Sequence, residues 1–78
     1  MTTTFYGVQA FVKKGAHFVA EQPRVATSEA SAKRMAESLS ATKAGTIAFS
    51  RSGDSETGEF EDPVILAEHG ELPTQDAF

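Results

Sequence analysis

The chain has 78 residues, of which 40% are hydrophobic and 23% are charged, and its formal net charge is −4. This profile is typical of one small soluble globular domain, and the absence of cysteine excludes disulfide cross-links, thiolate nucleophiles and cysteine zinc sites. No apolar run approaches the ~18 residues of a membrane span and the N-terminus has no signal-peptide pattern, so we expect a cytoplasmic protein without membrane contact.

The first predicted element is a β-hairpin. Residues 4–12 alternate in hydrophobicity and contain aromatic and β-branched side chains, which predicts a strand. Residues 13–15, two lysines and a glycine, are typical of a three-residue turn with glycine in the left-handed position. Residues 16–26 are then the return strand, in which Pro23 indicates a sheet edge or a bend because proline cannot donate to a ladder.

The length of this turn determines which side chains share a face of the hairpin. With three turn residues, Val12 lies opposite Ala16. The face predicted to enter the core carries Tyr6, Val8, Ala10, Val12, Phe18 and Ala20. The opposite, mixed face carries Phe5, Gln9, Phe11, His17 and Val19.

A single helix is predicted next, over residues 28–43. Thr27 or Ser28 can accept hydrogen bonds from the free amides of the first turn, and Gly45 is a natural stop. The helix has one apolar stripe with i, i+3, i+4, i+7 spacing, formed by Ala32, Met35, Ala36 and Leu39. Because this stripe is rich in alanine, we expect the helix to approach a sheet closely.

Two further strands follow the helix. Residues 46–51 alternate, residues 52–59 are a polar loop with two glycines, and residues 60–69 contain an apolar run whose start is marked by Pro63. Residues 71–78 have no period and are expected to form a flexible or loosely docked tail.

The order of elements predicts an α+β fold, a two-layer ββαββ domain over residues 1–70. Its four-stranded, mostly antiparallel sheet has one helix packed on one face. The other face is half apolar, with either Val64 or Ile65 beside the mixed face of the first hairpin, and such faces commonly bind partners. The candidate interaction face is Phe5, Gln9, Phe11, His17 and Val19. A homodimer through this face is one expectation, and a tail that folds back with Leu72 and Phe78 is the alternative.

Charge divides the chain into two parts. Residues 1–51 carry seven basic and three acidic residues, a net charge of +4, whereas residues 52–78 carry eight acidic and no basic residues. Such asymmetry indicates either two binding surfaces of opposite charge or an attraction between the two parts across the fold.

No catalytic or cofactor motif is found. His17 and His69 are simple strand residues in this interpretation, and residues 54–59 form a solvated acidic loop rather than a calcium site, because the spacing of calcium ligands is missing. We therefore expect a non-enzymatic protein without metal or cofactor. By analogy of size and fold with small bacterial and phage proteins, it is predicted to be a protein-interaction module, either self-associating or partner-binding and regulatory.

The alternative function is a small nucleic-acid-binding regulator that uses the basic residues of 13–51. Its candidate basic patch is Lys13, Lys14, Lys33 and Arg34, with Phe5 and Phe11 available to stack on bases. Against it stand a sequence pI of about 5.0 and the absence of the RNA-recognition signature.

Overall fold

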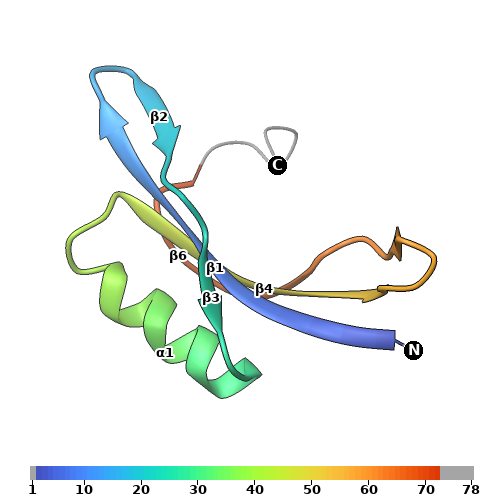
Figure 1. Ribbon diagram of the computed structural model, residues 1–78. Helices are drawn as coiled ribbons and strands as arrows, with labels where there is room; N and C mark the ends of the chain where they lie inside the picture. Colours follow the sequence, from blue (N-terminus) through green and yellow to red (C-terminus); the bar gives the residue numbers. More distant parts are fainter. Residues whose placement is uncertain (1, 73–78) are drawn as a thin grey trace.

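Two long strands form the centre of the fold in the computed structural model, which describes residues 2–72. Strand β1 (Thr2–Lys14) pairs antiparallel with β4 (Gly45–Asp54) along nearly its whole length, with Val8 opposite Ala48. Figure 1 shows these two strands crossing the molecule side by side. Their alternating aromatic and β-branched residues suit the pleated, half-buried surface of a central strand.

Each outer strand is interrupted once. On one side of β1 lie β2 (His17–Ala20) and β3 (Arg24–Ala26), and beside β4 lie β5 (Glu59–Phe60) and β6 (Val64–Gly70). Pro23 and Pro63 lie in the two interruptions, because proline has no N–H with which to donate a hydrogen bond to the neighbouring strand. The α+β fold with a helix on the sheet is therefore confirmed, but the sheet has six strands and not four.

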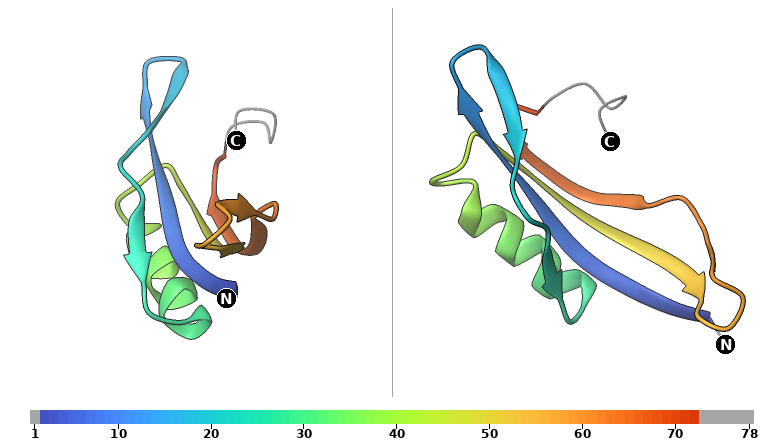
Figure 2. Two further views of the ribbon diagram at one scale, coloured as in Figure 1. Left: turned by 45° about the vertical axis from the view of Figure 1, so that its right-hand side comes forward. Right: turned by 45° about the horizontal axis from the view of Figure 1, so that its top comes forward.

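Helix α1 (Glu29–Leu39) covers one face of this sheet, as both views of Figure 2 show. Of the two candidate caps, Ser28 is the N-cap, and its Oγ accepts from the amide of Ser31 at 3.1 Å. The helix ends earlier than predicted because Ser40 and Thr42 donate their hydroxyls back to carbonyls of the last turn, which competes with further helix. Gly45 does not stop the helix; it begins β4.

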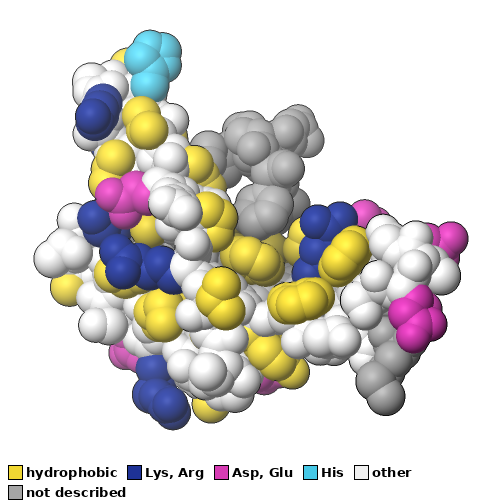
Figure 3. All heavy atoms as spheres, in the orientation of Figure 1, with side chains coloured by type: hydrophobic (Ala, Val, Ile, Leu, Met, Phe, Trp, Pro, Cys, Tyr) yellow, Lys and Arg dark blue, Asp and Glu magenta, His cyan; other side chains and the backbone are white. Residues whose placement is uncertain are grey.

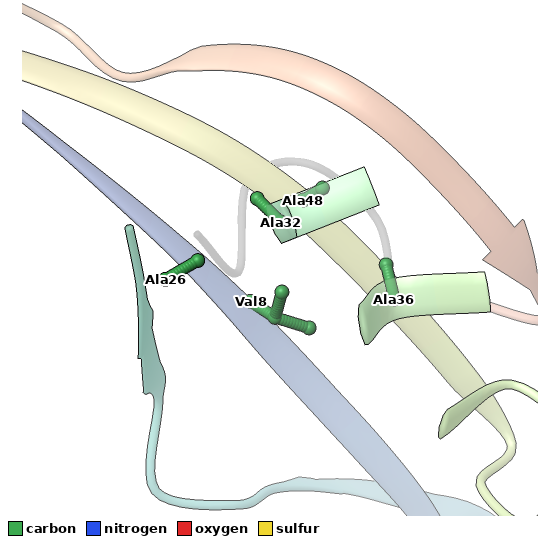
Figure 4. Close-up of a cluster of buried hydrophobic side chains, with 5 residues drawn as sticks. All are labelled: Val8, Ala26, Ala32, Ala36 and Ala48. Carbon is green, nitrogen blue, oxygen red and sulfur yellow. The ribbon is translucent and has the colours of Figure 1, made fainter. Parts of the chain in front are cut away.

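The fully buried centre of the core between helix and sheet consists of small side chains. Figure 4 shows its central cluster, which is Val8, Ala26, Ala32, Ala36 and Ala48. Because alanine has only a methyl group, the helix axis can lie close to the sheet, as the alanine-rich stripe predicts. The two larger members of that stripe, Met35 and Leu39, are partly buried and pack around the cluster.

One buried hydroxyl joins the helix to β4. Thr46 is fully buried, and its Oγ1 donates to the carbonyl of Ala36 at 2.7 Å. That carbonyl also accepts from the amide of Ser40, so removal of the hydroxyl leaves no unpaired acceptor. Thr46→Val is therefore expected to lower the free energy of unfolding by about 1 kcal/mol, the net value of one hydrogen bond.

Urea unfolding measures this change, and Thr42→Val is the matched control. The hydroxyl of Thr42 is exposed and lies 3.4 Å from its acceptor, so we expect a change below ~0.5 kcal/mol. Equal losses in the two variants would show that the Thr46 bond contributes nothing specific.

The register of the first hairpin differs from the prediction. Lys14 remains in the ladder opposite His17, and Val12 lies opposite Val19, so the turn contains only Gly15 and Ala16. Gly15 has φ +63°, and glycine at the first position is typical of a tight type II′ turn, whose twist matches the strands.

The predicted assignment of side chains to the faces of the return strand was therefore wrong. His17 and Val19 share the helix side of the sheet with Lys14 and Val12. Two predicted core residues, Phe18 and Ala20, instead lie opposite Lys13 and Phe11, on the side away from the helix.

Candidate interaction surface

The face of the sheet opposite α1 carries large apolar side chains in neighbouring rows. One row crosses the middle of the sheet through Val25, Gly7, Phe49 and Ile65, which are successive partners on four strands. Because side chains alternate along a strand, Phe5 lies on the same face two residues from Gly7. The middle of this face is therefore apolar across the full width of the sheet.

Two glycines let aromatic rings lie against the backbone of this face. A Cβ built at Gly7 would lie 2.8 Å from Cζ of Phe49, so the ring occupies the space of the missing side chain. In the same way, the ring of Phe60 lies over Gly53. Rings that cover glycines in this manner lie close to the backbone, and the sheet determines their positions.

At one end of this face an aromatic pair lies beside a single cation. The rings of Phe5 and Phe60 are 6.2 Å apart between centroids and tilted by 39°. The guanidinium carbon of Arg51 lies 5.2 Å from the Phe60 centroid, and its Nε donates to the carbonyl of Glu61 at 3.1 Å. This geometry is that of a cation–π contact, which holds the exposed ring in place.

Four side chains of this face are large, apolar and exposed, and together we call them the outer apolar surface. They are Phe5 (49% exposed), Val25 (84%), Phe60 (46%) and Ile65 (40%). Scattered exposed hydrophobics are normal on a protein, but a group on one sheet face of a small domain is typical of an interaction site.

The other end of the same face is covered by the chain itself. Gly70, with φ +74°, turns the chain after β6, and the amide of Glu71 then donates to the carbonyl of Ala44 at 2.9 Å. Leu72 lies over Gly45, where an added Cβ would be 2.7 Å from its Cδ2. Of the predicted tail, 71–78, these two residues are docked on the sheet, whereas Phe78 lies outside the described residues.

The residues of the predicted interaction face are divided between the two faces of the sheet. Phe5, Gln9 and Phe11 share the face away from the helix, whereas His17 and Val19 lie on the helix side. Phe5 is exposed, but Phe11 is buried, and Nε2 of Gln9 donates to the carbonyls of Ala10 and Glu21. Of the five, Phe5 alone belongs to the outer apolar surface.

Three members of the outer apolar surface are not among the five residues predicted for the interaction face. Val25 follows the bend at Pro23, so its face depends on a pairing that a sequence does not reveal. Phe60 is an apolar residue within an acidic segment, and this contrast could have identified it from the sequence as a candidate for the surface. Ile65 was one of two alternatives, and the register of β6 against Phe49 selects it.

The predicted basic patch is divided between two parts of the molecule. Lys13 and Lys14 lie at the end of β1 near the hairpin tip, which projects beyond the helix in Figure 1, whereas Lys33 and Arg34 are exposed on α1. The Lys and Arg side chains in Figure 3 accordingly form several separate groups.

Some of these cations also have acidic neighbours. Nζ of Lys33 lies 3.1 Å from Glu29, and Nζ of Lys13 lies 3.5 Å from Glu71 and 5.6 Å from the ring centroid of Phe18. The Lys13–Glu71 pair joins the basic and acidic parts of the chain, as one of the two charge interpretations predicts.

Acidic side chains gather where β4 turns into β5. We call this region the acidic end, and it comprises Asp54, Glu56, Glu59, Glu61 and Asp62. Its turn is closed by bonds from the amide of Gly58 to the Asp54 carbonyl and from the amide of Glu56 to the Asp54 carboxylate. Among residues 2–72, no group of three or more acidic or histidine side chains is arranged to hold a metal ion.

Comparison with protein-family models, with curated proteins and with solved structures finds no match for this chain. Within residues 2–72, no helix is long and apolar enough to cross a membrane. The outer apolar surface and the acidic end are therefore the features from which a function can be inferred.

Proposed function

We propose that this chain is a non-enzymatic, cytoplasmic protein-interaction module that docks another polypeptide through its outer apolar surface. The observation that supports the proposal is the exposure, between 40% and 84%, of four large apolar side chains on one sheet face. Burial of apolar area is the main favourable term in most protein association.

The geometry of the surface favours docking further. Phe60 is held between Gly53, Phe5 and Arg51, so its ring needs little ordering when a partner binds, and less side-chain entropy is lost. Charged groups of the acidic end lie beside it and supply a polar rim, which is the usual organisation of an interface.

One depression within residues 2–72 lacks the character of an active site. It has a volume of about 360 Å³ and is lined by the consecutive residues Glu21, Gln22, Pro23 and Arg24. An active site normally brings polar groups from separate elements together in one cavity, and this depression is formed by a single bend of the chain.

The charges around the exposed aromatic pair support a nucleic-acid ligand less well than a polypeptide. The exposed aromatic pair Phe5 and Phe60, which would have to stack on bases, lies beside the acidic end. Phosphates following those bases would meet carboxylates, while the four predicted cations lie at the hairpin tip and on α1.

Photo-crosslinking in living cells tests the proposed function. We expect a full-length chain with p-benzoylphenylalanine at Val25 to form an ultraviolet-dependent adduct with a polypeptide. The control places the same group at Ala30, which is exposed on α1 and outside the surface. Equal labelling from the two positions, or none from Val25, would contradict docking through this face.

A further inference from the structure

The last strand of the sheet has one free side. Strand β6 pairs with β4, and within residues 2–72 no strand pairs with its other side, which we call the free edge. The right-hand view of Figure 2 shows β6, in orange, at the border of the sheet. The opposite border is interrupted at Pro23, whereas β6 runs unbroken over seven residues.

The hydrogen-bond pattern shows which backbone groups of β6 face the free edge. The carbonyl of Ser52 in β4 accepts from the amide of Glu61 at 2.8 Å, so the even-numbered residues of β4 direct their backbone groups toward β5 and β6. Their partners in β6 are Val64, Ala67 and His69. Because hydrogen-bonded and non-hydrogen-bonded pairs alternate along an antiparallel ladder, the amides and carbonyls of Ile65 and Glu68 point to the free edge.

The free edge has little of the protection that sheet edges usually carry. Proteins block such edges with lysine, proline, other charges or bulges. Strand β6 contains neither lysine nor proline; it has one carboxylate, that of Glu68, and a bulge that inserts Leu66 between Ile65 and Ala67. Leu66 and Ala67 pack against the core, which holds the strand in place. The bulge leaves Ile65 and Glu68 on the outer face, where a neighbouring strand can pair with them.

We propose that the partner of the outer apolar surface adds a strand to this free edge, and that the added strand is an extended, basic segment of another protein. Unpaired backbone amides and carbonyls recognise an extended backbone, which is the basis of β-strand addition. The apolar row that ends at Ile65 then continues onto the partner. This inference rests on the proposed function and adds the chemistry of the partner.

Charge complementarity selects a basic partner. Carboxylates lie before, within and after β6, at Glu61, Asp62, Glu68 and Glu71, and residues 52–72 contain no lysine or arginine. Within residues 2–72, Glu71 pairs with Lys13 at 3.5 Å, whereas the carboxylate of Glu68 has no ion pair. A cation of the partner opposite Glu68 therefore meets an unpaired carboxylate at the edge itself.

The same charges disfavour a second copy of β6 at the free edge. Both flanks of β6 are acidic, so two copies side by side would face carboxylates with carboxylates, whichever direction the second strand ran. Arg51 does not offset these charges, because it lies over the ring of Phe60 and donates to the carbonyl of Glu61. It is also four residues along β4 from Ile47, the partner of Glu68.

The register gives the partner a sequence pattern. The strand pairs described in this sheet are antiparallel, and we expect the added strand to follow them. Ile65 and Glu68 are three residues apart, but the bulge takes up one of them, so the residues opposite them in a regular strand are two apart. The partner therefore carries a basic residue opposite Glu68 and, two residues later, an apolar residue opposite Ile65.

Titration of the isotope-labelled full chain with a synthetic peptide, followed by NMR, tests the inference. The probe is a capped seven-residue peptide of threonine, with arginine at its third position and valine at its fifth, because threonine favours an extended backbone. We expect saturable shifts with a Kd below ~1 mM and slowed hydrogen exchange at the amides of Ile65 and Glu68. No shifts at ~2 mM peptide, or shifts confined to α1, would overturn strand addition at β6.

N-methylation of the peptide separates strand addition from contact through side chains alone. Methyl groups on the amides of the arginine and the valine, which face β6, should weaken binding at least ~tenfold because they block hydrogen bonds to the edge. Methyl groups on the amides of the fourth and sixth residues, which point away from β6, are the matched control and should change the affinity less than ~threefold. Equal effects of the two modifications would contradict pairing with the edge.

A charge swap tests the basic character of the partner. Glu68→Lys should weaken binding of the arginine peptide about fivefold and strengthen, by a similar factor, a peptide with glutamate in place of arginine. Glu56→Lys changes the net charge equally but lies in the turn between β4 and β5, so it should affect neither peptide. Both side chains are exposed, so both variants keep their fold, which circular dichroism checks. Equal effects of the two substitutions would show that net charge alone acts, against a basic residue opposite Glu68.

Other occupants of the free edge give different results. Slowed exchange at Ile65 and Glu68 that grows with protein concentration in the absence of peptide would identify a second copy and overturn the basic segment. If the Val25 photo-adduct formed while no peptide added to β6, the proposed function would stand and strand addition would fail. If the peptide added to β6 while Val25 formed no adduct, docking through the outer apolar surface would fail instead.

Discussion

Replacement of Ala36 by leucine is expected to lower the free energy of unfolding by about 2–3 kcal/mol. The Ala36 side chain is fully buried in the cluster with Val8 and Ala48, so three added carbons must displace the helix from the sheet. Overpacking of a dense core typically costs about 1–3 kcal/mol. For a domain of this length the total stability is on the order of 4–12 kcal/mol, so the loss is a large fraction of it.

The matched control is Ala30→Leu on the same helix. Ala30 is exposed, and leucine and alanine have similar helix propensities, so its effect should stay within ~0.5 kcal/mol. Both variants are compared by their urea midpoints at constant m-value. Similar midpoints would mean that the helix does not pack on the sheet through Ala36.

Gly70→Ala is expected to lower the free energy of unfolding by about 3 kcal/mol. Gly70 has φ +74°, which costs an L-residue roughly 1–2 kcal/mol. Its added Cβ would also overlap the carbonyl oxygen of Ala44 and lie 3.2 Å from the Cα of Gly45. The backbone of Ala44 and Gly45 cannot yield as a side chain would, so a further ~1–3 kcal/mol is expected.

Gly15→Ala separates these two contributions. Gly15 has φ +63°, but an added Cβ there meets nothing within 4 Å, so the conformational cost of roughly 1–2 kcal/mol remains alone. Gly70→Ala should also accelerate hydrogen exchange at the amide of Glu71, whose bond to the Ala44 carbonyl depends on this turn. Equal destabilisation by the two variants, with Glu71 still protected, would contradict the close approach at Gly70.

Local patterns predicted most of the elements. The alternation of residues 4–12 marked the centre of β1, and the stripe that includes Ala32 and Ala36 marked the buried face of α1. Pro23 correctly marked the interruption of the first outer strand. These predictions succeed because each depends on residues within one or two turns or on the chemistry of one residue.

The faces of the first hairpin could not be predicted in the same way. The turn has two residues and not three, so every side chain of the return strand lies on the face opposite to the predicted one. Val19, for example, lies on the helix side. Val25 lies beyond the bend at Pro23, where local alternation no longer carries the register. A half-apolar face opposite the helix was therefore predicted correctly, but most of its residues were not.

The sequence alone determined the α+β class, the alanine-rich buried stripe of the helix and the separation of charge along the chain, because composition, period and spacing are local properties. The tertiary structure alone decided the strand order and the members of the outer apolar surface. The physical reason is that cross-strand pairing joins residues far apart in the chain, such as Gly7 and Phe49, and only the folded chain establishes those pairs.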